Sequence, residues 1–227
     1  MSEREEPRPD PVRTTLADSA YRLVTEQGVE ALTVRRLAEA AGTSTMAVYS
    51  RFGSIGAVAG EVCERGFAEF GAALADVGGS DDPVVDLMCQ GLAYLKFATG
   101  HPLLYTLMFQ YTSPEWVGSQ RKSLLQHGNP TDSAAGRAAF QVMADAVRRV
   151  TEPGTDEGDI LIRSGVAWST VHGLAMLSIA GHLSGAHDLV ARAALISLAV
   201  GGGTSRDAAE RAFDDAARRM TDIGQRP

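Results

Sequence analysis

Residues 32–49 combine residue types and spacings that suit contact with DNA. Thr33 is placed to cap a short helix, and Gly42 supplies a tight turn after it. Ser44 then begins a second helix, whose free backbone N–H groups can face a phosphate. This order of elements is typical of a helix-turn-helix, in which the second helix enters the major groove.

Side chains along this segment divide into those suited to bases and those suited to phosphates. The small residues Thr45 and Ala47 let the backbone approach base edges, where their methyl groups can touch thymine methyls. Tyr49 and Arg51 lie farther along the same helix, where phosphate oxygens are expected. The predicted DNA contacts are Thr33, Arg35, Arg36, Ser44, Thr45, Met46, Ala47, Tyr49, Ser50 and Arg51. An ordinary helical hairpin is the alternative, because such patterns give false positives.

The flanking sequence favours the DNA-binding interpretation. Residues 28–38, followed by residues 48–54, resemble the tetracycline-repressor (TetR) family of bacterial transcriptional regulators, and the resemblance extends over residues 12–62. Two positions depart from the family pattern: Thr43 replaces the usual Val, and Ile55 replaces the usual Lys. Without that lysine, which normally lies beside a phosphate, we expect weaker sequence-independent affinity and a flatter salt dependence.

The resemblance also assigns roles to single residues. It implies a phosphate contact at Tyr49 and a base contact at Arg35. In the C-terminal part, residues 101–109 and 168–173 resemble the motifs of a subgroup named for its Trp-His-Gly domain. The family implies dimerisation through the last two long helices and a ligand cavity within each protomer.

A homodimer is favoured by the residues themselves as well. The helices expected at 160–183 and 189–200 are apolar almost all round, so they need partners on more than one side. Two such helices from each of two chains form a four-helix bundle.

An effector would bind in the C-terminal part, where most aromatic and methionine side chains occur. Most of them must form the core, and a subset would line a cavity for an apolar or aromatic molecule. The candidates are Phe67, Phe70, Tyr105, Met108, Phe109, Phe140, Met143, Trp168, His172 and Met176. For Trp168 and His172, a core pair and a ligand contact are equally good interpretations. Gly173 either leaves room for ligand or permits close helix packing.

Catalytic and metal-binding patterns are missing from the sequence. It has no phosphate-binding loop, no Gly-x-Gly-x-x-Gly, no Gly-x-Ser-x-Gly elbow and no His-Glu-x-x-His. His182, His187 and Asp188 are spaced poorly for one metal site, so we expect solvated histidines at a helix end. No enzymatic activity, cofactor or metal is predicted. A helical enzyme and a structural interaction protein without DNA binding are the alternatives.

Helices must position these residues, because apolar side chains recur every three or four positions along the chain. Three short helices are expected to end near Gly28, Gly42 and Phe52. Later helices are expected at 55–77, 85–100, 102–109, 140–150, 159–183, 187–200 and 205–220, and a loop with at most one short helix at 112–130. The helix at 159–183 is expected to be buried on several sides, whereas the last has only a thin apolar stripe and is expected to pack weakly. The fold class is therefore all-α.

Domain organisation and composition complete the prediction. We expect a disordered tail at 1–10, a three-helix DNA-binding domain at 11–57, and a helical ligand-binding and dimerisation domain at 58–227.

No uninterrupted apolar run reaches the roughly 18 residues of a membrane span, and the start lacks a secretory signal, which predicts a cytoplasmic protein without a membrane partner. The net charge of −7 leaves room only for a small DNA-reading face. Cys63 and Cys89 are expected to be buried thiols, with a redox pair as the alternative.

These observations predict a DNA-binding transcriptional regulator. Its most specific form is a repressor that binds a palindromic operator as a homodimer and leaves it when a ligand binds. The predicted partners are a double-stranded DNA operator, a small apolar or aromatic effector, and a second copy of the chain.

Overall fold

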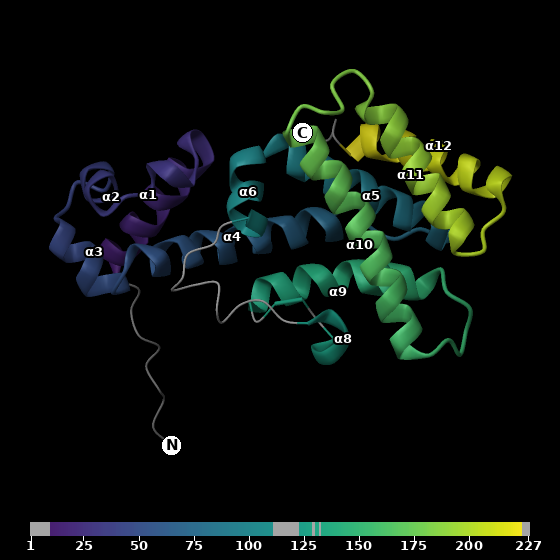
Figure 1. Cartoon of the computed structure of the whole chain (residues 1–227), viewed down its shortest axis with the longest axis horizontal. Helices are drawn as coiled ribbons and strands as arrows, with labels where there is room; N and C mark the ends of the chain where they lie inside the picture. The colour runs from purple at the N-terminus through teal and green to yellow at the C-terminus, as the bar shows by residue number, and fades with distance from the viewer. Residues whose placement is uncertain (1–9, 111–122, 129, 132, 224–227) are drawn as a thin grey trace. The chain divides into compact units, whose positions relative to one another are not determined.

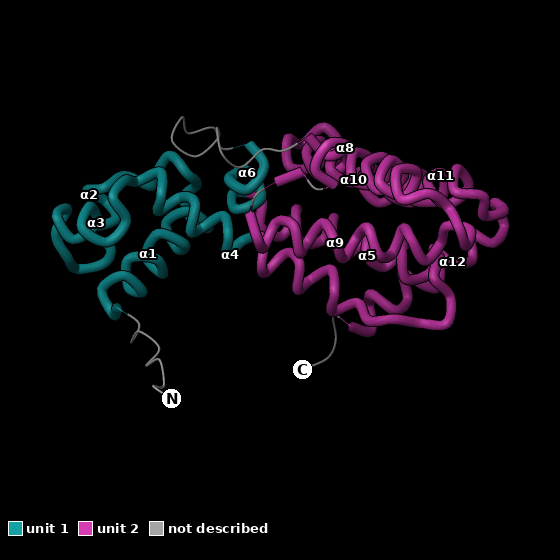
Figure 2. The backbone as a smooth tube through the Cα atoms, turned by 90° about the horizontal axis from the view of Figure 1, so that it is seen from below, with its two compact units in different colours: residues 1–66, 103–119 teal, residues 67–102, 120–227 magenta. Residues whose placement is uncertain are grey.

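The computed structural model describes residues 10–110, 123–128, 130–131 and 133–223. Within these ranges the chain forms helices joined by turns and contains no strand, which confirms the all-α fold class (Figure 1). The chain divides into two compact units, residues 1–66 with 103–119 and residues 67–102 with 120–227 (Figure 2). The expected disordered tail lies outside the described residues except for Asp10, and the expected loop at 112–130 lies largely outside them.

The first unit contains the short helices. It comprises α1 (Pro11–Gln27), the 3-10 turn η1 (Val29–Ala31), α2 (Val34–Ala40), α3 (Thr45–Phe52), the first half of α4 (Ile55–Ala75) and α6 (Pro102–Gln110). Leu16, Leu37 and Val48 are fully buried and bring α1, α2 and α3 onto one small core. The α6 helix, expected in the C-terminal domain, therefore groups with the N-terminal helices.

Side-chain caps define where these helices begin. The Asp10 carboxylate accepts hydrogen bonds from the backbone N–H groups of Val12 and Arg13, so Asp10 belongs to the start of α1 and not to a tail. Thr33 and Ser44 cap α2 and α3 in the same way, with bonds of 3.3 and 3.2 Å. Between them Gly42 adopts φ +61°, a conformation that residues with a side chain rarely adopt. The helix starts predicted at Thr33 and Ser44 are confirmed.

The second unit is built around α5. It comprises the end of α4, α5 (Pro83–Gly100), α8 (Leu124–His127), α9 (Ala134–Arg149), α10 (Glu157–Ile179), α11 (His187–Gly201) and α12 (Arg206–Ile223). The α5 helix contacts α9, α10, α11 and α12, and its residues Met88, Cys89 and Leu95 are almost fully buried. Gly91 allows the approach of α11, because a Cβ at this position would lie 2.5 Å from Cδ2 of Leu195.

Two expectations about the C-terminal helices are wrong. The α10 helix ends at Ile179 and not at residue 183, and turns containing Gly181 and Gly185 follow it. The α12 helix was expected to pack weakly, yet it contacts α5 and α11 and buries a stripe that includes Phe213. Ala209, Ala212 and Ala216 complete that stripe, and their small side chains permit close approach, so a thin stripe is sufficient.

The α10 helix is not enclosed within one protomer. Ile162, Val166 and Leu177 expose 52%, 53% and 46% of their surface, so the expected burial on several sides is not met by this chain alone. Among the described helices, α10 also has the length and mean hydropathy of a membrane-crossing helix, despite its interrupted apolar sequence. Core helices of soluble proteins share that composition.

A buried carboxylate connects three segments of the second unit. Asp86, with a side chain only 3% exposed, accepts hydrogen bonds from the backbone N–H and hydroxyl of Ser80. It also pairs with Arg149 at 2.6 Å and Arg219 at 3.1 Å, at the ends of α9 and α12. Burial alone would raise the pKa of Asp86, but the bonds from Ser80 and Arg149 outweigh it and hold this pKa below its usual value.

Candidate DNA interface and ligand cavity

The α2 and α3 helices form a compact helix-turn-helix within the first unit. Leu37, Ala38 and Val48 are buried along the seam between them, and this burial turns the other side of α3 outward. Met46 and Tyr49 are 74% and 53% exposed there. The remaining predicted DNA contacts are also exposed, apart from the half-buried Ala47. The structure thus gathers them on the two helices and their caps.

The three arginines of this surface differ in what holds them. Arg35 is exposed and makes no hydrogen bond or ion pair with any described residue. The Arg36 guanidinium donates to the side-chain oxygen of Gln27. Arg51 pairs with the carboxylate of Asp10, so part of its charge is already compensated. Arg35 is therefore the cation of the three that is available to a ligand without breaking an internal contact.

Asp10 is a participant that the sequence interpretation missed. Burial would raise its pKa, but bonds from the N–H groups of Arg13 and Val12, together with the Arg51 guanidinium, hold this pKa below its usual value. Its role as the first cap of α1 could have been predicted from the sequence, since an Asp directly before Pro11 suits a helix start. Its pairing with Arg51 depends on the fold and is not visible in the sequence.

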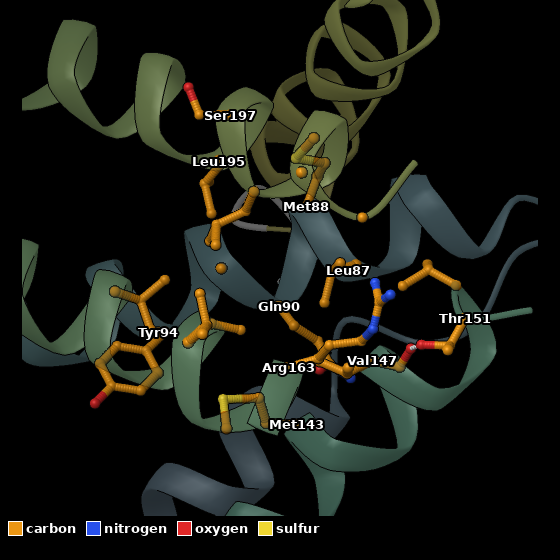
Figure 3. Close-up of a pocket in the computed structure, with 18 of the residues that line it drawn as sticks. Leu87, Met88, Gln90, Tyr94, Met143, Val147, Thr151, Arg163, Leu195 and Ser197 are labelled. Carbon is orange, nitrogen blue, oxygen red and sulfur yellow. Dashed lines mark hydrogen bonds between the residues drawn. The ribbon is translucent and has the colours of Figure 1, made fainter. Parts of the chain in front are cut away.

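The second unit contains a cavity of about 480 Å³, within the range of about 300–1,000 Å³ that ligand pockets occupy (Figure 3). Its walls come from α5, α9, α10 and α11, and Leu74 of α4 completes the lining. Most lining side chains are aliphatic or thioether, including Leu87, Met88, Met143, Val147 and Leu195. Such a wall suits a largely apolar molecule.

Few polar groups reach this cavity. The Thr151 hydroxyl donates to the carbonyl of Val147 at 2.7 Å, and the Tyr94 hydroxyl lies 3.4 Å from Nδ1 of His172. Burial lowers the pKa of His172, which favours the neutral ring. Asp159 and Arg163 are exposed lining residues of opposite charge on α10. Arg163 makes no hydrogen bond or ion pair with any described residue, so the lining includes a cation without a partner.

Of the side chains predicted to bind ligand, Met143 lines this cavity. Phe70 stacks edge-on against the lining residue Tyr94, with ring centroids 4.8 Å apart. Phe140 contacts Trp168, which in turn contacts His172, and none of these three lines the cavity. Phe67 and Met176 do not line the cavity, and neither does Gly173. A Cβ at Gly173 would meet open space, so this residue is not packed closely within the protomer.

The other three candidates belong to a different part of the chain. Tyr105, Met108 and Phe109 are on α6, which groups with the first unit. Tyr105 is fully buried there and its ring lies 4.6 Å from that of Phe109. Aromatic rings fill space efficiently, so they form cores, and the cavity remains where aliphatic and small residues meet. Glycines would have predicted the position of the cavity better than the aromatic residues did. Gly91 on α5 and Gly201-Gly202 at the end of α11 all line it.

Histidine, cysteine and carboxylate residues show no arrangement for a metal. Among the residues that the structure describes, no group of three or more such side chains could hold an ion. His182 is exposed as expected, whereas His187 is half-buried, with Nδ1 lying 2.6 Å from the Ser178 hydroxyl. Cys63 and Cys89 are buried thiols in different units, and burial raises the pKa of each.

Comparison with known proteins supplies the family. The model described as "Bacterial regulatory proteins, tetR family" matches residues 16–62, and "Tetracyclin repressor-like, C-terminal domain" matches residues 87–200. The chain belongs to the tetracycline-repressor family. It is a TetR-family transcriptional regulator, with the N-terminal match covering the whole helix-turn-helix. The Trp-His-Gly subgroup stays a prediction.

Solved structures agree with this assignment of the fold. A protein with unknown function from Rhodococcus sp. RHA1 is 26% identical with a TM-score of 0.66, over 88% of this chain and 100% of that one. The TetR family transcriptional regulator PfmR from Thermus thermophilus is 20% identical with a TM-score of 0.51, over 78% of this chain and 97% of that one. No curated protein sequence matches the chain.

Proposed function

We propose that this TetR-family regulator is a cytoplasmic repressor that binds a palindromic operator as a homodimer and is released when a ligand occupies the cavity of the second unit. No catalytic step is part of this proposal. The observation that carries it is the exposed outer face of α3, where Met46 and Tyr49 project from a buried helix-turn-helix seam.

The DNA-binding part of the proposal uses that face in two ways. Met46 is the most exposed large apolar side chain of the described residues, and it suits contact with thymine methyl groups. Tyr49 and the N-terminal N–H groups of α3 suit phosphates. Ile55 begins α4 in place of a lysine, so affinity for unrelated DNA should be modest.

The homodimer part rests on the apolar surface of α10 and α11. Ile162, Val166 and Leu177 recur at helical spacing on α10, and Leu189 at the start of α11 is 73% exposed. Full burial of one such side chain stabilises by about 1.5–3 kcal/mol, so a second copy seated there gains several of these contributions. A two-fold axis presents the same stripe from both chains, and it also requires a palindromic operator.

The position of the cavity supports the ligand-release part of the proposal. The α10 and α11 helices form both its wall and the surface offered to the second copy. Two recognition helices must lie about 34 Å apart to enter successive major grooves. A ligand that binds a different dimer geometry more tightly lowers operator affinity by that difference in affinity.

Selection of genomic DNA fragments with the purified protein tests the proposal. We expect an enriched palindrome with half-sites centred about one helical turn apart, or a related spacing. Footprints of a single asymmetric half-site bound by a monomer would contradict the dimer, and the absence of any enriched sequence would contradict the regulator itself.

A further inference from the structure

One polar atom in the cavity wall has no partner. The side-chain oxygen of Gln90 on α5 is buried and accepts no hydrogen bond from any residue that the structure describes. A buried acceptor left without a donor is costly, so native proteins almost always provide one. The neighbouring wall is formed by aliphatic side chains such as Leu87 and Leu195, which have no donor to offer.

The other polar lining groups are either occupied or exposed. The Thr151 proton is already donated to the Val147 carbonyl, and the Tyr94 hydroxyl lies beside His172. Asp159 and Arg163 are exposed, and their charges are opposite. Gln90 is thus the interior group whose hydrogen bonding is left for a ligand to complete.

We propose, building on the proposed ligand cavity, that it binds a largely apolar molecule with a hydroxyl group that donates to Gln90 Oε1. The last torsion of a glutamine side chain is broad, so the amide can turn its oxygen toward the cavity. A hydroxyl then donates to Oε1 and can accept from the amide nitrogen.

Titration calorimetry with two naphthalene probes tests this chemistry. 1-Naphthol has the donor, and 1-methoxynaphthalene keeps the ring system without it. The wild-type protein should bind 1-naphthol about tenfold more tightly than 1-methoxynaphthalene.

Two variants assign the preference to one side chain. Gln90→Leu should lose the tenfold preference, while Gln126→Leu, at an exposed glutamine of α8 outside the cavity lining, should keep it. Gln90→Leu should also melt at the same temperature as the empty wild-type protein or higher, because it removes an unsatisfied acceptor. Gln90→Met, whose flexible thioether fills a similar volume, provides a second variant if leucine packs poorly.

Three results would overturn the inference: no binding of 1-naphthol, equal affinity for the two neutral probes, or an unchanged preference in both Gln90 variants. These measurements use the protein without DNA. A hydroxyl preference that depends on Gln90, found in a protein that releases no operator, would uphold this inference and contradict the proposed ligand release. Operator release by a protein that binds both neutral probes equally well would uphold the proposed ligand release and contradict this inference.

Discussion

Exposed arginines of the helix-turn-helix are not equivalent, because internal partners compete with phosphates and bases for their charge. Arg51 is held by Asp10, and its backbone carbonyl accepts a hydrogen bond from Arg13 at 3.2 Å. Arg36 is held by Gln27, while Arg35 has no partner among the described residues. A base contact therefore costs Arg35 no existing interaction.

Replacement of Arg35 by alanine should weaken operator binding selectively. Loss of a base contact costs about 1–3 kcal/mol on the cognate site and relaxes the preference at one position per half-site. Competition binding on cognate and scrambled DNA measures this, with Arg211→Ala, an exposed arginine on α12, as the charge-matched control. Equal losses on both DNA sequences would show that Arg35 does not read a base.

Removal of the Tyr49 hydroxyl should act without regard to sequence. The side chain is 53% exposed on α3, where a phosphate contact is expected. Tyr49→Phe should lower affinity for cognate and scrambled DNA by a similar factor, because a phosphate contact carries no base information. A loss confined to the cognate site would instead assign Tyr49 to a base.

At the scale of the helices, the second unit depends on α5 and on the buried Asp86 near its start. This carboxylate joins the loop at Ser80 to Arg149 and Arg219, and it directly precedes the cavity residue Leu87. The cavity walls formed by α5 and α9 are thus positioned in part by one ionised group.

Asp86→Asn should destabilise the protein at neutral pH. We expect a loss of about 1–3 kcal/mol, at the lower part of the range for buried pairs because Arg149 is half exposed. The folded-state pKa of Asp86 lies below its unfolded value of about 3.9, so its contribution is complete above that pH and is lost as the pH falls through the folded pKa.

Urea unfolding at a series of pH values measures this effect. The wild-type protein and Asp86→Asn should differ most near pH 7, and their stabilities should converge below about pH 4. Asp214→Asn, at an exposed ion pair with Arg192, is the matched control and should change stability by less than about 1 kcal/mol. A difference that persists unchanged in acid would show that charge on Asp86 is not the cause.

At the scale of the whole molecule, the apolar side chains exposed on α10 and α11 support the proposed homodimer. Leu177 and Leu189 lie outside the cavity lining, so their exposure is not explained by ligand binding. Gly173, four residues before Leu177, has open space where a Cβ would lie, which suits the close approach of a helix from a second copy.

Leu177→Arg should therefore produce monomers. A charge on an apolar two-fold surface is repeated in both copies and is left without a partner, so dimerisation should be lost and operator affinity should fall at least about tenfold. Sedimentation velocity and operator binding measure the two effects. Leu125→Arg, at an exposed leucine of α8, should leave both unchanged. A fully dimeric Leu177→Arg protein would place the interface elsewhere.

The all-α class, most helix boundaries, the helix-turn-helix and the family could be predicted from the amino-acid sequence. These features depend on information within a few residues, such as the cap at Thr33 or the turn at Gly42, or on a short motif. The strength of α12 packing was missed because it depends on how closely small side chains let another helix approach.

The residues that surround the cavity and the arginines that are free became known with the tertiary structure. None of the aromatic residues expected to line the cavity does so, and the cavity lies where Gly91 and aliphatic side chains of α4, α5, α9, α10 and α11 meet. The pairing of Asp10 with Arg51 and the lone oxygen of Gln90 depend on contacts between distant segments. Local periodicity fixes which face of a helix is apolar, but whether that face meets a neighbour, a void or solvent depends on the packing of the whole unit.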